Sequence, residues 1–407
     1  MQAKKTRQNA EYDQIAKGVG FQRGVYAFCR TFIGPVVNIL FHIRYKPCKI
    51  QSKTFLALGN HTQNLDPAFL VIGTRRHMRF VANASLTKGL AGFFLNPFFG
   101  IIPREKGAKG DAAIAAIEAN LRAGVSVGMF PEGNRSWDGE TEFISPRTAR
   151  MAKESGAALV TYRITGGYLL RPRWAEHKRR GPMRGELVHE YTPEELASMS
   201  EEGIYQAICR DLHVNAYEVQ AAHGDLYKGK ALAEGLQYAA YLCPHCLRFG
   251  TIRTSGNEIH CDCGLSARYL ETGWFEKGSL MPFDNFAQWN RFQKQWMNEH
   301  SAELRLSTGK PLASDSDFEL SRIEHGKIHR LSEHASIALF GDRVEIRHEK
   351  QCITCRIDEI TGYGTFLSRS MYFNCGPEIR YQLIAHKPVS TLKYYALWRS
   401  LSGREYR

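Results

Sequence analysis

Short apolar runs alternate with helical patterns through the first half of the chain. Four runs rich in β-branched and aromatic residues have the length of buried strands. These runs are residues 54–60, 78–84, 125–131 and 157–165. Helices are predicted between them, at 66–74, 110–124 and 145–156. Strands and helices in alternation predict an α/β fold with a mainly parallel sheet flanked by helices, in which sites gather beyond the strand ends.

The middle of the chain changes character. Residues 192–220 are helical in pattern, and a cysteine-rich segment occupies 241–264. A helix is then predicted at 284–300. Its aromatic face consists of Phe286, Trp289, Phe292 and Trp296.

The last hundred residues are mostly strand-like. Gly341 and Asp342 form a two-residue signal for a hairpin turn, and an amphipathic helix is predicted at 390–401. Several antiparallel strands closed by one terminal helix predict a small β domain that resembles the pleckstrin-homology type in pattern.

Charge and hydropathy narrow the partners. The 407 residues carry a formal net charge of +13, which favours acidic partners such as nucleic acid, an anionic membrane or phosphorylated substrates. Two uncharged windows, 31–43 and 89–103, are shorter than the ~20 residues of a spanning helix. The first is flanked by arginine and lysine, which suits either a helix in the membrane interface or a buried helix with a charged back. The N-terminus has no apolar core of a secretory signal.

The cysteines predict one metal site. Ten cysteines are few for this length, so we expect a reducing compartment and no disulfide framework. Four of them form a C-x2-C pair and a C-x-C pair, the pattern of a zinc ribbon with a structural Zn²⁺ and no catalysis. These four are Cys243, Cys246, Cys261 and Cys263. The second pair is one residue short, so His245 or His260 is an alternative ligand. Cys352 and Cys355 face opposite sides of a strand, so we expect no metal there, with or without Cys375.

His61 and Asp66 are the first candidates for catalysis. Both lie in the turn after a predicted strand, where a carboxylate on one imidazole nitrogen fixes the tautomer of a general base. The alternative is structural: Asp66 is also a natural N-cap for the next helix, with Pro67 in the first turn.

Two further turns add charged residues. Residues 99–107 leave a strand and present Arg104 and Lys106, and residues 130–139 present Glu132, Gly133 and Arg135. In a parallel sheet all three turns open on one edge. The sequence therefore predicts a site for an anionic substrate with a hydroxyl group to deprotonate.

These three stretches resemble a known family. They read NHTQNLD at 60–66, GIIPR at 100–104 and FPEGNRS at 130–136. Their order and spacing resemble the glycerolipid acyltransferases, typified by 1-acylglycerol-3-phosphate acyltransferase. The resemblance covers roughly residues 50–220.

The resemblance implies a role for each site residue. His61 would take the proton of a lysolipid hydroxyl, which attacks an acyl thioester directly, and Asp66 would orient His61. Arg104, with Arg135 near it, would bind the phosphate. The remaining expected substrate-binding residues are Asn60, Lys106, Glu132 and Gly133. The co-substrate would be acyl-CoA or acyl carrier protein, with no acyl-enzyme and no catalytic cofactor.

Three positions depart from the family pattern. Asn134 stands where the family has threonine, and Lys106 stands where the family's second-block cation often lies. Residues 159–167 lack the proline of the family's fourth block. The acceptor's identity therefore stays open.

The expected organisation has five parts. They are a basic amphipathic membrane-interface segment at 1–50, an acyltransferase domain at 51–235, a zinc ribbon at 236–275, an aromatic linker helix at 276–301 and a β-rich domain at 302–407. We expect an enzyme at the cytoplasmic face of a membrane, peripheral or monotopic, that converts a lysophospholipid such as 1-acylglycerol 3-phosphate to phosphatidic acid. The ribbon lacks a basic and aromatic stripe, so nucleic acid is not expected. The alternative is a non-catalytic lipid- or nucleic-acid-binding protein built on a decayed acyltransferase domain.

Overall fold

The computed structural model divides the chain into two compact units. The first contains the described residues up to Pro172 together with Arg179–Tyr227, and the second contains Arg173–Lys178 and the rest of the chain from Lys228. The described residues are 15, 18–40, 42–46, 48–87, 97–104, 111–325, 327–366 and 368–404.

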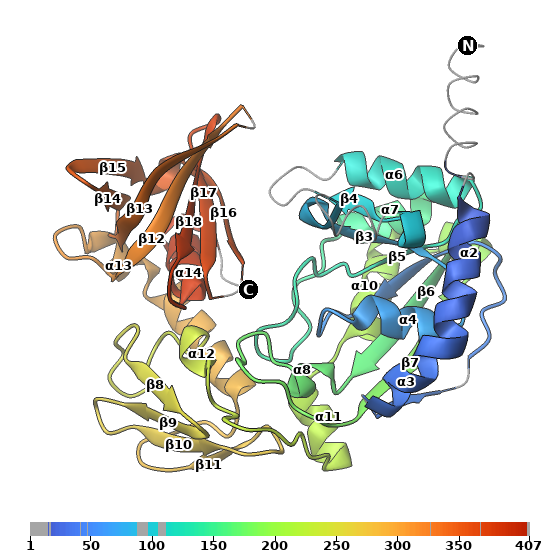
Figure 1. The fold of residues 1–407 in the computed structure, drawn as a ribbon, viewed down its shortest axis with the longest axis horizontal. Helices are drawn as coiled ribbons and strands as arrows, with labels where there is room; N and C mark the ends of the chain where they lie inside the picture. Colours follow the sequence, from blue (N-terminus) through green and yellow to red (C-terminus); the bar gives the residue numbers. More distant parts are fainter. Residues whose placement is uncertain are drawn as a thin grey trace. The chain divides into compact units, whose positions relative to one another are not determined.

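A seven-stranded sheet forms the centre of the first unit (Figure 1). In spatial order its strands are β1 (Ile43–Tyr45), β7 (Met183–Tyr191), β6 (Ala158–Thr165), β2 (Phe55–Gly59), β5 (Val127–Met129), β3 (Arg79–Asn83) and β4 (Ile102–Arg104). All neighbouring pairs are parallel except β6 with β7. Every residue of β2 is buried, as expected for a central strand covered on both faces. The predicted α/β class with a mainly parallel sheet is confirmed.

Helices of this unit cover the sheet. They are α4 (Asp66–Thr74), α6 (Asp111–Arg122), α7 (Arg147–Glu154), α8 (Gly167–Leu170), α9 (Pro193–Ser198), α10 (Glu201–Leu212) and α11 (Ala216–His223). Apolar side chains of α6, α7, α9 and α10 form one core with strands β2, β5 and β6. The stretch predicted as helical at 192–220 is three helices, because residues 199–200 and 213–215 adopt extended backbone and begin new helices with Ser200 and Asn215 as caps.

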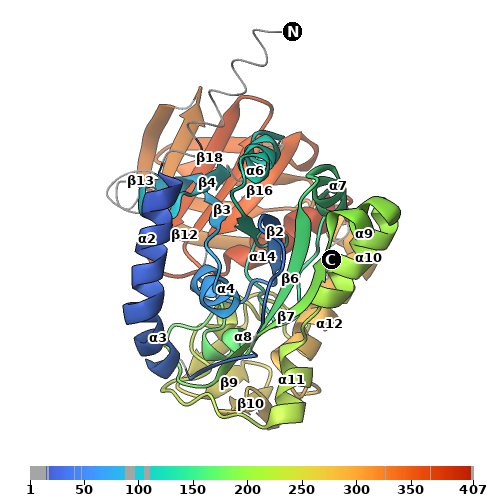
Figure 2. The same cartoon turned by 90° about the vertical axis from the view of Figure 1, so that its right-hand side faces the viewer.

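The N-terminal helix, drawn in blue in Figure 2, carries apolar side chains that are exposed. It runs through α2 (Val19–Phe28), a π-helical turn (Cys29–Ile33) and α3 (Gly34–Leu40). The exposed side chains include Phe21, Phe28, Phe32, Val36 and Ile39. Their spacing of three, four or seven residues places them along one side of the helix. The sequence allowed a buried helix at 31–43, and the exposed side chains rule out that interpretation.

Within the described part of the chain, no helix combines the length and the apolar character needed to cross a membrane. Residues 89–96 of the second apolar window lie outside the described residues.

The second unit begins with a four-stranded antiparallel sheet. Its strands are β8 (Ile252–Ser255), β9 (Glu258–Cys261), β10 (Ser266–Tyr269) and β11 (Phe275–Lys277). Two helices follow, α12 (Phe286–Glu299) and α13 (Ser301–Leu306). Phe286 and Trp289 of α12 are fully buried, so the predicted aromatic face belongs to a core.

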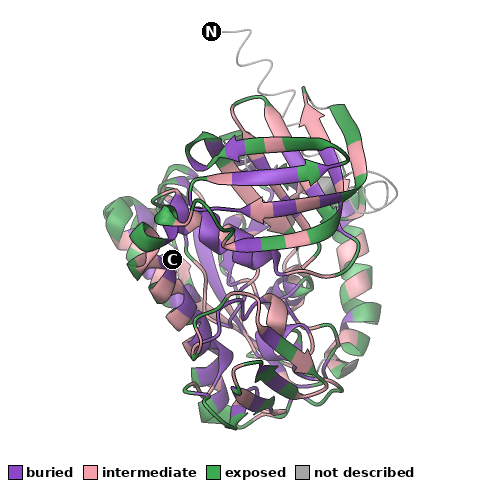
Figure 3. Cartoon of the chain, turned by 90° about the vertical axis from the view of Figure 1, so that its left-hand side faces the viewer, coloured by how far each residue is buried: buried purple, intermediate pink, exposed green. Residues whose placement is uncertain are grey.

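A seven-stranded antiparallel sheet and a terminal helix complete the second unit (Figure 3). In spatial order the strands are β15 (Gln351–Arg356), β14 (Arg343–His348), β13 (Lys327–Leu339), β12 (Ala313–Glu324), β18 (Ile379–Ala385), β17 (Ser370–Cys375) and β16 (Ile360–Phe366). Helix α14 (Thr391–Leu401) contacts β16 and is buried along most of its length. The predicted antiparallel β domain with a terminal helix is confirmed, and Gly341 and Asp342 form the turn between β13 and β14.

One disulfide closes this sheet. It joins Cys355 of β15 to Cys375 of β17, whose Cα atoms are 6.0 Å apart. Because β15 and β17 lie near opposite ends of the strand order, the bond shows that the sheet curls into a partial barrel. This bond departs from the sequence analysis, which expected a reducing compartment without a disulfide framework.

Candidate active site

His61 and Asp66 are in direct contact. The Nδ1 atom of His61 lies 2.8 Å from Oδ2 of Asp66, and the Asp66 side chain is completely buried. His61 follows β2 and Asp66 is the first residue of α4, so the turn between strand and helix brings the two side chains together. The arrangement is that of an imidazole oriented by a carboxylate.

The carboxylate of Asp66 faces back into the turn. Its Oδ2 accepts hydrogen bonds from the backbone N–H groups of Thr62 (2.6 Å) and Gln63 (2.8 Å), and Oδ1 accepts one from the Thr62 hydroxyl (3.0 Å). The N-cap position belongs to Leu65, and no side chain caps the helix. The alternative of Asp66 as a helix cap is therefore wrong, because its acceptor sites are filled by His61 and the turn.

Glu132 holds the backbone of His61. Its Oε1 accepts the His61 N–H at 2.6 Å and its Oε2 accepts the Glu142 N–H at 2.7 Å. The backbone N–H of Ser136 donates to the His61 carbonyl at 3.1 Å. Burial raises the pKa of Glu132 well above its usual range, while the two backbone donors act in the opposite direction. Both backbone groups of His61 are thus fixed by the turn after β5.

An aromatic ring packs against one face of the imidazole. Phe130 stacks on His61 with the ring centroids 4.5 Å apart and the planes 21° from parallel. A Cβ on Gly59 would lie 3.0 Å from the Phe130 ring and 3.2 Å from Leu70, so a larger residue there would press on Phe130. The His61 side chain keeps 21% of its surface exposed and can still reach a substrate.

Arginines surround this turn. Arg104 is exposed at the end of β4, and its Nη1 lies 3.6 Å from the place that a Cβ on Gly133 would occupy. Burial lowers the pKa of Arg135, the neighbouring Arg171 lowers it further, and Asp66 acts against both. Arg171 directly follows α8, the short helix that comes after strand β6. Lys106 lies outside the described residues.

Asn60 is a tie between strands. Its buried side chain donates to the Ile164 carbonyl at 2.8 Å and accepts from the Ile164 N–H at 2.7 Å. Both ends of the amide are used by the backbone of β6, which fixes the end of β2 just before His61. Gly133 is exposed, with φ of +70° in the turn after β5.

Sequence reasoning missed three supporting residues. Thr62 gives Asp66 two hydrogen bonds, Phe130 carries the imidazole, and Gly167 leaves room for Thr62. A Cβ on Gly167 would stand 2.1 Å from the Thr62 hydroxyl. Thr62 and Phe130 lie inside the motifs, but the Gly167 contact spans more than a hundred residues and leaves no local signal.

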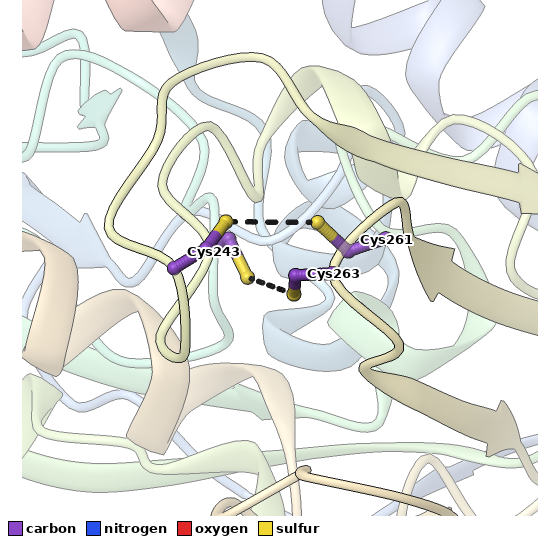
Figure 4. Close-up of side chains that lie close together, drawn as sticks. Cys243, Cys261 and Cys263 are labelled. Atoms are coloured by element: carbon purple, nitrogen blue, oxygen red, sulfur yellow. Dashed lines mark hydrogen bonds between the residues drawn. The ribbon is translucent and has the colours of Figure 1, made fainter.

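Four cysteines converge in the second unit (Figure 4). Their Sγ atoms all lie within 4.8 Å of one another, with 3.7 Å between Cys243 and Cys263 and 3.9 Å between Cys246 and Cys261. Two tight turns present them: Leu247 N–H donates to the Cys243 carbonyl, and Gly264 N–H donates to the Cys261 carbonyl. The predicted cluster could hold a metal ion, with four cysteines and neither His245 nor His260.

The sulfur spacing fits zinc. A tetrahedral Zn²⁺ with bonds of about 2.3 Å sets neighbouring sulfurs about 3.8 Å apart. Burial acts to raise the pKa of Cys246, but hydrogen bonds from Arg248, Cys243 and Cys261 lower it overall, whereas burial raises the pKa of Cys243 and Cys263.

One comparison with known proteins covers the segment that contains these residues. Residues 42–165 match the model of a protein family described as Acyltransferase. That segment contains His61, Asp66, Arg104, Glu132 and Arg135. This part of the chain is therefore similar to that family.

Solved structures give weaker likenesses. The 1-acyl-sn-glycerophosphate (LPA) acyltransferase PlsC from Thermotoga maritima is 16% identical, with 56% of this chain and 99% of that chain covered and a TM-score of 0.40. Inner Membrane Complex Sub-compartment Protein 3 from Toxoplasma gondii is 9% identical (26% and 84% covered, TM-score 0.18). The C-terminal domain of an unknown protein from Leishmania infantum is 10% identical (28% and 99% covered, TM-score 0.18). No curated protein matches this chain.

Proposed function

We propose that the protein transfers a fatty acyl group from a thioester to the free hydroxyl of a lysophospholipid. The observation that carries the proposal is the His61–Asp66 pair, held from both sides by Glu132 and the turn of residues 61–63. The family match supports acyl transfer in general. We further propose that the acceptor is a lysophospholipid and that the donor is acyl-CoA or acyl carrier protein.

The contact of His61 with a carboxylate, which accepts hydrogen bonds, supports a proton on Nδ1. Because Nδ1 of His61 donates to Asp66, Nε2 is the nitrogen that accepts the substrate proton. The hydroxyl oxygen then attacks the thioester carbonyl carbon, and the tetrahedral intermediate collapses with cleavage of the C–S bond. The leaving thiolate takes the proton back from Nε2. The buried Asp66 carboxylate stabilises the imidazolium between these two steps.

The arginines suit a phosphate on the acceptor. Arg104 over the Gly133 turn and Arg135 beside Asp66 offer planar guanidinium groups, which bind phosphate with two hydrogen bonds. Arg171 adds a third positive charge near Arg135. A phosphate monoester next to the reacting hydroxyl fits 1-acylglycerol 3-phosphate, with phosphatidic acid as product.

The exposed apolar stripe fits a membrane substrate. Phe28, Phe32 and Ile39 project from the N-terminal helix, and both acceptor and product are lipids. We place the enzyme at the cytoplasmic face of a membrane, with this helix in the interface.

Acyl transfer by the purified protein tests the proposal. Acyl-CoA and acyl carrier protein would each be offered with a panel of lysophospholipids in vesicles. His61→Ala should lose on the order of 10² to 10⁴ in rate. His223→Ala, an exposed histidine at the end of α11, is the matched control and should keep its rate. If the wild type transfers to no acceptor, the non-catalytic binding protein becomes the better explanation.

The four cysteines are proposed to hold a structural Zn²⁺. Four protein ligands leave no open position, so the ion would stabilise the ribbon and take no part in the chemistry. Cys243→Ser should lower bound zinc from one equivalent to nearly none and unfold residues around β8–β11, as measured by metal analysis and hydrogen exchange. Cys352→Ser, an exposed thiol in the same unit, should keep the zinc. Full zinc retention by Cys243→Ser would contradict the assignment.

A further inference from the structure

A basic cavity lies at the edge of the first sheet opposite the catalytic turns. It has a volume of about 320 Å³, within the range of small-ligand pockets. Its lining includes Arg23, Tyr26, Lys53, Arg75, Arg76 and His77.

The cavity is distinct from the active site. Lys53 precedes β2, His77 precedes β3 and Ser126, also in the lining, precedes β5. His61 and Glu132 instead follow β2 and β5. The five residues of β2 separate the two edges by roughly 17 Å, at about 3.3 Å per residue. One anion cannot contact both.

Most of the positive charge that lines the cavity has no ion-pair partner within the described part of the chain. No carboxylate lines it, and no ion pair with Arg23, Lys53 or Arg75 occurs among the residues that the structure describes. Three exposed cations from three different segments are thus gathered around one cavity. Such a concentration of like charge favours a bound anion.

Arg76 gives the cavity a rigid wall. Its guanidinium donates to the carbonyls of Ile50 (3.2 Å), Ser52 (2.9 Å) and Lys53 (2.7 Å). It also lies over the Phe55 ring, with 5.1 Å between the Cζ atom and the ring centroid. The nearby carboxylate of Glu190 accepts hydrogen bonds from the backbone N–H groups of Gln51 and Ser52 and also attracts Arg76. The charge of Arg76 is therefore fixed in place before any ligand arrives.

His77 reports the same electrostatic field. Burial, together with Arg23 and Arg79, lowers the pKa of His77 to about 4. Its buried Nε2 has no hydrogen-bond partner among the described residues. Burial is the larger cause of this shift, and the contribution of the arginines shows that the ring lies in a positive electrostatic potential.

We propose that this cavity binds the phosphate group of an anionic ligand, either a phospholipid headgroup or a soluble phosphate ester. Arginine is the side chain best suited to phosphate, and the cavity offers three of them with one lysine. Arg23 and Tyr26 come from α2, the helix whose other side exposes Phe21 and Phe28. A phosphate held here would lie beside the surface that we place at the membrane.

The test uses the full chain with two cations removed. The variant Arg23→Gln/Arg75→Gln changes only exposed side chains, so folding should survive; a circular-dichroism melt checks this. Arg180→Gln/Lys228→Gln removes the same charge from two other exposed positions and is the matched control. Two probes are titrated: inorganic phosphate, followed by the imidazole NMR signal of His77, and vesicles of phosphatidylcholine with or without phosphatidic acid, followed by co-sedimentation.

The expected result is specific to the cavity. Phosphate should shift the His77 signal and raise its pKa, and the Arg23→Gln/Arg75→Gln variant should weaken binding by roughly 25-fold, about fivefold for each cation. The control should change little. Loss of phosphatidic-acid-dependent sedimentation in the same variant identifies a lipid headgroup, whereas a His77 response with unchanged sedimentation identifies a soluble phosphate ester. If phosphate leaves His77 unchanged and the two double variants sediment alike, the proposal is wrong. None of these readouts depends on acyl transfer.

Discussion

Two histidines at opposite edges of one sheet have contrasting surroundings. His61, after β2, has a buried carboxylate at 2.8 Å and an aromatic ring beneath it. Burial, together with Arg23 and Arg79, lowers the pKa of His77, which precedes β3, to about 4. The first environment orients the imidazole against a carboxylate, and the second disfavours the charged form of the ring. The comparison teaches that the chemistry of a histidine here follows from what the tertiary fold places beside it.

Removing the carboxylate beside His61 should have the largest effect. Asp66→Asn keeps the size of the side chain but removes the charge that stabilises the imidazolium, so kcat should fall on the order of 10² to 10⁴. Steady-state acyl transfer measures this. Asp111→Asn, an exposed carboxylate in the same unit, is the control. A near-normal kcat for Asp66→Asn would show that the carboxylate beside His61 has no role in catalysis.

Crowding the turn behind His61 should have an intermediate effect. A Cβ at Gly167 would press on the Thr62 hydroxyl, which donates to Asp66, so Gly167→Ala should destabilise the first unit by about 1 to 3 kcal/mol and slow transfer. Urea unfolding and kcat are measured together. Gly24→Ala, with open space around its added methyl group, should cost no stability. Equal stability of the two variants would show that the turn tolerates displacement.

The pH dependence of His77 should be the smallest effect. The pKa of His77 is lower in the folded state than its ordinary 6.5, so folding favours the neutral ring. Its contribution to stability is present above pH ~6.5 and is lost as pH falls toward about 4. Because the ring is partly exposed, we expect a loss of about 1 to 2 kcal/mol. Urea unfolding of wild type and His77→Gln across this range measures it, and the variant should lose less.

An equal dependence of unfolding free energy on pH in wild type and His77→Gln would contradict this expectation. If wild type and His77→Gln lose the same stability as pH falls, the pKa of His77 is not lowered by its surroundings in the folded state. Added phosphate sharpens the test, because a bound anion should reduce the loss in the wild type alone.

The sequence by itself determined the elements and the motifs. Apolar runs and amphipathic stretches located β2, β3, β5 and β6 with the helices between them, because their periodicity is local. The four-cysteine cluster was also predictable, because each pair is presented by a turn only a few residues long. The contact between His61 and Asp66 was predictable for the same reason, because both lie within one short turn.

Only the tertiary structure decided how these parts are supported. Glu132 reaches the His61 N–H across 71 residues of sequence, and Gly167 faces Thr62 from another strand–helix connection. The basic cavity gathers Arg23, Lys53 and Arg75 from a helix, a strand start and a helix end. Each contact depends on the order of strands in the sheet. That order is set by long-range packing, which leaves no trace in the local pattern of the chain.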